Sequence, residues 1–183
     1  MLNSAAIAKS TRYKYWVFGA LAIGTFASVV DHGSVTVALP SIAKDFQTDL
    51  PSAQWVVIGY ALTISALLLP MGRLADIAGR KRIYVLGTLV LVIGSVVAGL
   101  APNLGVLLVA RFVQGIGAAM TQGTSMAIIT SVFPAKERGR AIGLIMTTVG
   151  VGAVAGPAIG GLVVDALGWP AVFFMTIPLG LVG

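Results

Sequence analysis

The sequence predicts an all-α, polytopic membrane protein that folds as a bundle of six transmembrane helices. Hydrophobic residues make up 57% of its 183 residues and charged residues only 10%, whereas a soluble domain has about 25% charged residues. The apolar residues also form long runs separated by short polar breaks, as expected when lipid surrounds helices and charge collects in loops. Transmembrane strands would instead alternate in hydrophobicity over about ten residues.

A helix needs about 20 apolar residues to cross the ~30 Å hydrocarbon core of a bilayer. The predicted helices cover residues 15–39, 53–71, 83–101, 104–129, 141–164 and 167–183, and form one domain over residues 15–183 after a cytoplasmic segment of residues 1–14.

Each helix is bounded by turn-forming or basic residues. The first follows the basic N-terminal segment and ends at Pro40; it is too long for the apolar part of a signal peptide, so we expect an uncleaved helix. The second runs from Pro51-Ser52 to a basic loop, and the third from that loop to Pro102-Asn103. The fourth ends before Phe133-Pro134, the fifth runs from the next basic loop to Gly168, and the sixth is the shortest.

Basic residues predict the orientation. Ten of the twelve lysines and arginines lie in the N-terminal segment and in the loops after the second and fourth helices, all on one side of the bundle. Lys44 is the one basic residue on the other side. The positive-inside rule therefore places both termini in the cytoplasm of a multi-pass cell-membrane protein. This arrangement accounts for the net charge of +6 without a nucleic-acid partner.

The sequence lacks the residue patterns that commonly form enzyme active sites. There is no cysteine and one histidine, His32, so neither a thiolate nucleophile nor a metal site is expected. The glycine-rich stretches lie within predicted membrane helices and are not nucleotide-binding loops. We expect no enzyme activity and no cofactor.

Three strongly polar residues, Asp31, Arg111 and Gln114, lie inside predicted membrane spans. A charge at the bilayer centre costs about 2.5–3.5 kcal/mol on insertion scales, so each needs a partner or water. Asp31 and Arg111 lie about 13 Å from the outer surface, counted from Pro40 and Pro102 at 1.5 Å per residue, and can meet if the first and fourth helices face each other. We favour a protonatable carboxylate held by a cation; the alternative is a static ion pair that joins two helices.

A substrate cavity is expected beside this pair. His32 neighbours Asp31, and Gln114 and Gln122 lie on the fourth helix. A second interpretation of His32, as a hydrogen-bond donor to a neighbouring helix, is equally open.

The segment from Gly72 to Arg82 holds an ordered pattern of charge. Two glycines permit a tight backbone, and one aspartate lies among arginines and a lysine; the residues are Gly72, Asp76, Gly79, Arg80, Lys81 and Arg82. We expect Asp76 to lie at a helix N-terminus or to pair with an arginine, which would latch two helices together at the cytoplasmic face. The plain alternative is a basic loop that only sets topology.

Small residues form a stripe on the fifth helix, with Pro157 inside it. The stripe consists of Gly143, Gly152, Gly156, Gly160 and Gly161. Such stripes allow close helix packing, and the proline predicts a bend or a gate rather than ordinary packing alone.

Together these motifs resemble the N-terminal six-helix half of the major facilitator superfamily, with the fourteen-helix drug:proton antiporters as the most similar branch. The segment from Gly72 is similar to the signature loop of the family, the Arg111 region to its proton-coupling motif, and the stripe to its antiporter motif. The chain departs from the pattern at Ile77, Gly33 and Thr36. The resemblance implies proton coupling by Asp31 and Arg111, with the proton as coupling ion, and drug export rather than uptake.

We therefore expect a proton-coupled exporter of small lipophilic or cationic compounds; the alternative is a non-transporting membrane scaffold built from a half-transporter. One half alone would turn a polar face toward lipid, so a second six-helix half is expected. A parallel homodimer is favoured over a missing C-terminal half. Membrane lipid and a small-molecule substrate are the other expected partners.

Overall fold

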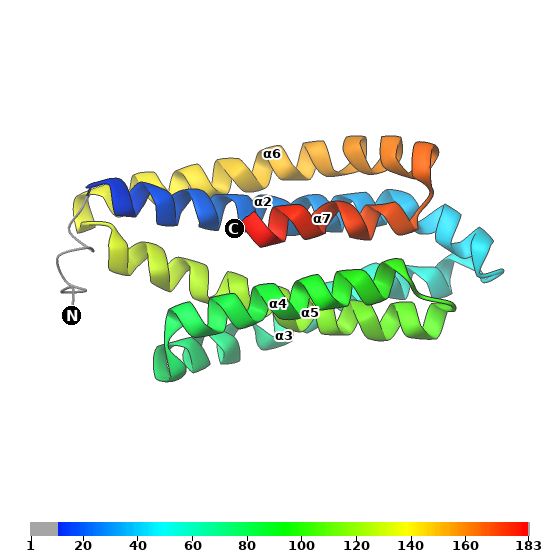
Figure 1. Ribbon diagram of the computed structural model, residues 1–183, viewed down its shortest axis with the longest axis horizontal. Coiled ribbons are helices and arrows are strands. Elements are labelled where there is room, and N and C mark those ends of the chain that lie inside the picture. The colour runs from blue at the N-terminus through cyan, green and yellow to red at the C-terminus, as the bar shows by residue number, and fades with distance from the viewer. Residues whose placement is uncertain (1–10, 183) are drawn as a thin grey trace.

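The computed structural model describes residues 11–182, and helices account for nearly all of them. The helices, in order, are α2 (Thr11–Asp45), α3 (Leu50–Ala78), α4 (Arg80–Gly99), α5 (Leu104–Val132), α6 (Ala135–Leu167) and α7 (Pro170–Val182). They run lengthwise through one elongated bundle, with α2, α6 and α7 on one side and α3, α4 and α5 on the other (Figure 1). The prediction of an all-α bundle is confirmed. Residues 1–10 of the predicted cytoplasmic segment lie outside the described residues.

Five of these helices, α2 to α6, are long and apolar enough to cross a membrane. The sixth, α7, has 13 residues within the described range. The helix bounds differ from the predicted ones because hydropathy locates the apolar part of a helix and not its polar ends. Thus α2 begins at Thr11, inside the predicted cytoplasmic segment, and the residues from Gly72 to Ala78 are the last turns of α3 rather than a loop.

The predicted end of the first helix at Pro40 is wrong, because α2 continues through this proline to Asp45. Proline cannot donate a backbone hydrogen bond, but the loss of one bond is tolerated where the rest of the helix is well packed. Three buried residues beyond or beside the proline, Leu39, Ile42 and Ala43, supply this packing.

Specific residues start and stop the other helices. Asp49 caps α3 by accepting a hydrogen bond from the backbone N–H of Ser52 (3.3 Å), and Asn103 caps α5 by accepting one from Val106 (3.0 Å). Gly79 alone separates α3 from α4, with a φ of 101°. A residue with a side chain is strained at this φ, so glycine permits the direct turn between the two helices.

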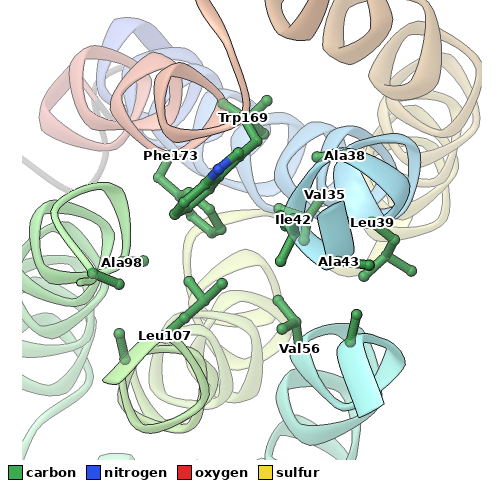
Figure 2. Packing of buried hydrophobic residues seen from close by; sticks show 14 residues of the cluster. Val35, Ala38, Leu39, Ile42, Ala43, Val56, Ala98, Leu107, Trp169 and Phe173 are labelled. Carbon is green, nitrogen blue, oxygen red and sulfur yellow. The ribbon is translucent and has the colours of Figure 1, made fainter. Parts of the chain in front are cut away.

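The two ends of the bundle differ in chemistry. The basic residues gather at one end, which we call the basic end. It contains the start of α2, the α3–α4 turn and the α5–α6 connection. Nearer the opposite end, side chains from both sides of the bundle meet in an apolar core that includes Ile42, Val56, Leu107 and Phe173 (Figure 2). Trp169 closes this core, and its indole Nε1 donates a hydrogen bond to Asp45 (2.9 Å).

Candidate functional site: a buried ion pair

Asp31 and Arg111 meet inside the bundle. Nη1 of Arg111 donates to Oδ2 of Asp31 at 2.7 Å and to Oε1 of Gln114 at 3.0 Å, while its Nε donates to the carbonyl of Val56 at 3.0 Å. The side chain of Arg111 is fully buried and that of Asp31 is 6% exposed. The first and fourth helices thus face each other at this point, which was the condition for the two residues to meet, and the pair joins α2 to α5.

One atom of each partner is left without a bond. Oδ1 of Asp31 and Nη2 of Arg111 are buried and have no hydrogen-bond partner among the described residues. A buried polar atom without a partner costs roughly 1–3 kcal/mol, and more when it belongs to a charged group. One oxygen of the carboxylate thus bonds the arginine, and the other makes no hydrogen bond within the described residues.

Two aromatic rings enclose the guanidinium. The ring centroid of Tyr60 lies 4.1 Å from Cζ of Arg111 and that of Phe173 lies 5.7 Å from it. A cation over an aromatic face is stabilised by the ring quadrupole, by about 2 kcal/mol or more once water is excluded. Sequence reasoning missed both rings, because an aromatic residue in an apolar helix carries no signal of the partner it will face.

A chain of hydrogen bonds extends the site across the bundle. Nε2 of Gln114 donates to Oγ of Ser95 on α4 at 2.7 Å, and Ser95 donates in turn to the carbonyl of Leu91 at 2.9 Å. Its Oγ also lies 3.5 Å from the hydroxyl of Thr176 on α7. Because Ser95 accepts from the amide nitrogen, the amide oxygen of Gln114 must face Arg111. Ser95 therefore orients Gln114, a role that the sequence did not indicate.

His32 and Gln122 occupy different places from the pair. The ring of His32 is partly buried and stacks on Tyr60, with centroids 6.0 Å apart, and Tyr60 in turn lies over the guanidinium of Arg111. Gln122 lies on the same side of α5 as Arg111 but three turns away, about 16 Å along the helix. The structure therefore does not place Gln122 beside the pair.

One expectation about the surroundings of the pair is wrong. The polar face predicted to lie against lipid does not exist, because Asp31, Arg111 and Gln114 are all buried within this one bundle. The need to cover these residues is no longer a reason for a second half.

The predicted latch at the basic end is an ion pair across the α3–α4 turn. Nη2 and Nε of Arg80 donate to Oδ1 of Asp76 at 2.9 and 3.1 Å, and Nη1 donates to the carbonyl of Ala127 on α5 at 2.8 Å. Arg80 thus ties the turn to α5. Gly72 contributes by close packing, since a Cβ there would lie 3.3 Å from the carbonyl of Gly123.

The remaining basic residues of this segment behave differently. Lys81 and Arg82 are exposed and form no side-chain hydrogen bond among the described residues. They fit the plain alternative of a topology-setting loop better than a latch.

The glycine stripe of α6 packs on α2, but only in its middle. A Cβ on Gly152, Gly156 or Gly160 would come within 3.1, 3.1 and 2.5 Å of α2, and Oγ of Ser34 donates to the carbonyl of Gly156 at 2.8 Å. Gly143 has open space, and the nearest atom to a Cβ on Gly161 is 3.8 Å away. The expected contact role is therefore wrong for these two.

Pro157 lies inside this interface. Its Cδ would be 2.9 Å from a Cβ on Gly33, and α6 continues as one helix through it. The close contact between Gly33 and Pro157 leaves little room for a side chain at position 33.

Comparison with known proteins agrees with this architecture. A family model described as the Major Facilitator Superfamily matches residues 21–183. The riboflavin transporter RibZ of Clostridioides difficile is 37% identical over 171 residues, which is 93% of this chain and 38% of the relative. The drug efflux pump JefA of Mycobacterium tuberculosis is 43% identical over 164 residues, 89% of this chain and 32% of that protein. The chain thus spans well under half the length of these relatives.

A solved structure shares the fold. The inward-facing, occupied form of a bacterial homologue of the human lysosomal transporter Spinster matches with a TM-score of 0.82 and 27% identity, over 94% of this chain and 43% of that one. The relatives are transporters, in agreement with the prediction that the chain is not an enzyme. With five membrane-spanning helices in its described part, this chain is a multi-pass membrane protein that belongs to the Major Facilitator Superfamily.

Proposed function

We propose that this chain forms one half of a proton-coupled exporter of small lipophilic or cationic compounds. One observation carries the proposal: a buried carboxylate, Asp31, that is bonded to Arg111 through one oxygen and has its other oxygen free. Ionisable groups at such positions in membrane proteins commonly belong to ion pathways. The relatives include a drug efflux pump, which supports export of small molecules.

Protonation of Asp31 would act on the packing of the two sides of the bundle. With Asp31 ionised, the attraction to Arg111 joins α2 to α5. Once Oδ1 takes a proton, Arg111 has only neutral acceptors, which are Oδ2 of Asp31, the carbonyl of Val56 and the amide oxygen of Gln114. An uncompensated buried charge is costly, so the bundle is driven toward an arrangement in which Arg111 meets water or another anion. This coupling would link proton binding to the exposure of the transport pathway.

Arg80 would influence the same rearrangement of the bundle from its position at the basic end. Its bond to the carbonyl of Ala127 and its pair with Asp76 hold the α3–α4 turn against α5. We assign these residues the role of a latch that keeps the cytoplasmic side closed in one state. Substrate would contact the partly buried ring of His32, which lies on Tyr60 and so touches the ring that covers Arg111.

A second six-helix half would complete the transport pathway. The length of the relatives supports a second half, because more than half of each compared relative lies outside the matched region. The second half is either a further region of a longer chain or another copy in a parallel pair. Mass measurement of the transporting particle distinguishes the two.

A non-transporting scaffold is the alternative, favoured by the complete burial of the ion pair within one half. The test is efflux of a cationic dye from proteoliposomes that contain the assembled transporter. The proposal predicts efflux when a pH gradient is imposed and its loss when an ionophore collapses the gradient. Equal dye movement with and without the gradient would favour the scaffold.

A further inference from the structure

A cavity of about 350 Å³ lies at the basic end, where the start of α2 meets the start of α6 and the end of α5. Its walls contain three aromatic rings, a carboxylate, a guanidinium and two aliphatic side chains: Tyr15, Phe18, Phe133, Glu137, Arg140, Ala141 and Leu144. None of these residues takes part in the ion-pair site. The proposed transport function leaves this cavity without a role.

The one carboxylate in the cavity is already neutralised. Nζ of Lys14 lies 2.6 Å from Oε2 of Glu137, and the same ammonium lies 5.3 and 5.9 Å from the ring centroids of Tyr15 and Phe133. Lys14 is thereby fixed beside the cavity with its charge satisfied.

Arg140, by contrast, is exposed and has no carboxylate partner among the described residues. Lys136 and Arg138 flank it in sequence and add positive charge. The cavity therefore presents an uncompensated guanidinium to any anion.

Polarity changes along the cavity in one direction. Glu137 and Arg140 lie at the basic end, and Ala141 and Leu144 follow about one to two turns further into the bundle, some 6–10 Å from Glu137. Phe18 on α2 lies on the apolar side, with its ring 6.2 Å from that of Phe133. A phospholipid presents its groups in the same order, a phosphate at the interface and acyl chains below it.

We propose that this cavity binds one anionic phospholipid, with its phosphate on Arg140 and an acyl chain along Phe18 and Leu144. Basic cavities between membrane helices on the cytoplasmic side suit anionic headgroups, and each nearby lysine or arginine contributes about 1 kcal/mol. Exposed Tyr15 and Trp16 at the start of α2 fit the headgroup level of the bilayer. The inference does not depend on transport activity.

Native mass spectrometry of the full chain tests the proposal. The protein is mixed in detergent with equal amounts of phosphatidylglycerol and phosphatidylcholine that have the same acyl chains. Wild type is expected to retain one phosphatidylglycerol in preference to phosphatidylcholine. Arg140→Gln should reduce that preference about fivefold, whereas Arg73→Gln, an equal loss of charge at an exposed position on α3 outside the cavity, should change it little. Equal retention of both lipids by wild type, or equal effects of the two variants, would overturn the proposal.

Two further arms separate a lipid from a free anion. Leu144→Gln should weaken phosphatidylglycerol retention, whereas Leu162→Gln, an exposed site on the same helix outside the cavity, should not. Inorganic phosphate in excess should fail to displace the bound lipid. Displacement by phosphate, or equal retention by both leucine variants, would mean a free-anion site and would contradict a lipid site.

Discussion

Arg111 and Asp31 lie 80 residues apart in sequence, yet Nη1 of one is 2.7 Å from Oδ2 of the other in the interior of the bundle. Asp31 belongs to the side formed by α2, α6 and α7, and Arg111 to the side formed by α3, α4 and α5 (Figure 1). The pair is thus a charged link between the two sides of the bundle.

Removal of the arginine should destabilise the protein strongly. Arg111→Ala leaves Asp31 as an unpaired buried charge, and the expected cost is about 3–5 kcal/mol of unfolding free energy. Adding Asp31→Asn should recover part of this loss, because no uncompensated charge then remains. Thermal unfolding in detergent measures both effects. Arg73→Ala, at an exposed position, is the control, and a similar small effect at both arginines would be inconsistent with a buried pair.

Ser95→Ala tests the chain of hydrogen bonds that runs from Gln114 through Ser95. The variant leaves the buried amide nitrogen of Gln114 without its acceptor, at an expected cost of about 1–3 kcal/mol. Thr88→Ala on the same helix is a matched control, because Thr88 donates only to the carbonyl of Tyr84 in its own helix. Denaturant-dependent unfolding compares the two. If Ser95→Ala and Thr88→Ala cost the same, Ser95 does not orient Gln114.

Neighbouring glycines of α6 should respond differently to alanine. A Cβ at position 160 would lie 2.5 Å from Cα of Ser34, whereas at position 161 the nearest atom is 3.8 Å away. Gly160→Ala is therefore expected to destabilise by about 1–3 kcal/mol through overpacking. Gly161→Ala should be neutral or slightly stabilising, since alanine favours helix over glycine. The melting temperatures of the two variants measure this difference. Equal shifts in melting temperature would argue against close packing of α2 on α6.

The latch should be visible in hydrogen exchange. Arg80→Gln removes the bond to Ala127 and the pair with Asp76, so amides near the α3–α4 turn are expected to exchange roughly tenfold faster. Arg82→Gln removes the same charge from an exposed side chain and should leave the exchange rates unchanged. If the amides near the turn are equally protected in the two variants, Arg80 is not a latch and serves only to set the topology.

Much of this fold follows from the sequence, because continuous apolar runs and the placement of basic residues are local signals. The sequence also makes Asp31 and Arg111 possible partners, since a charge inside a membrane span needs a partner or water. The predicted helix end at Pro40 was wrong because a packed membrane helix tolerates a proline that an isolated helix does not.

Other features depend on which faces meet, which no local pattern records. Tyr60 and Ser95 acquire their roles from Arg111 and Gln114 on another helix. Likewise, the stripe on α6 contains both close-packed and free glycines, and only the position of α2 separates Gly160 from Gly161.

The central proposal is that Asp31 carries the coupling proton, and one comparison tests it most directly. Asp31→Asn is measured in proteoliposomes of the assembled transporter for efflux driven by a pH gradient and for substrate counterflow without a gradient, beside the control Asp165→Asn. The account predicts that Asp31→Asn abolishes gradient-driven efflux but retains counterflow, which needs no net proton movement. Gradient-driven efflux at the wild-type rate in Asp31→Asn would contradict it.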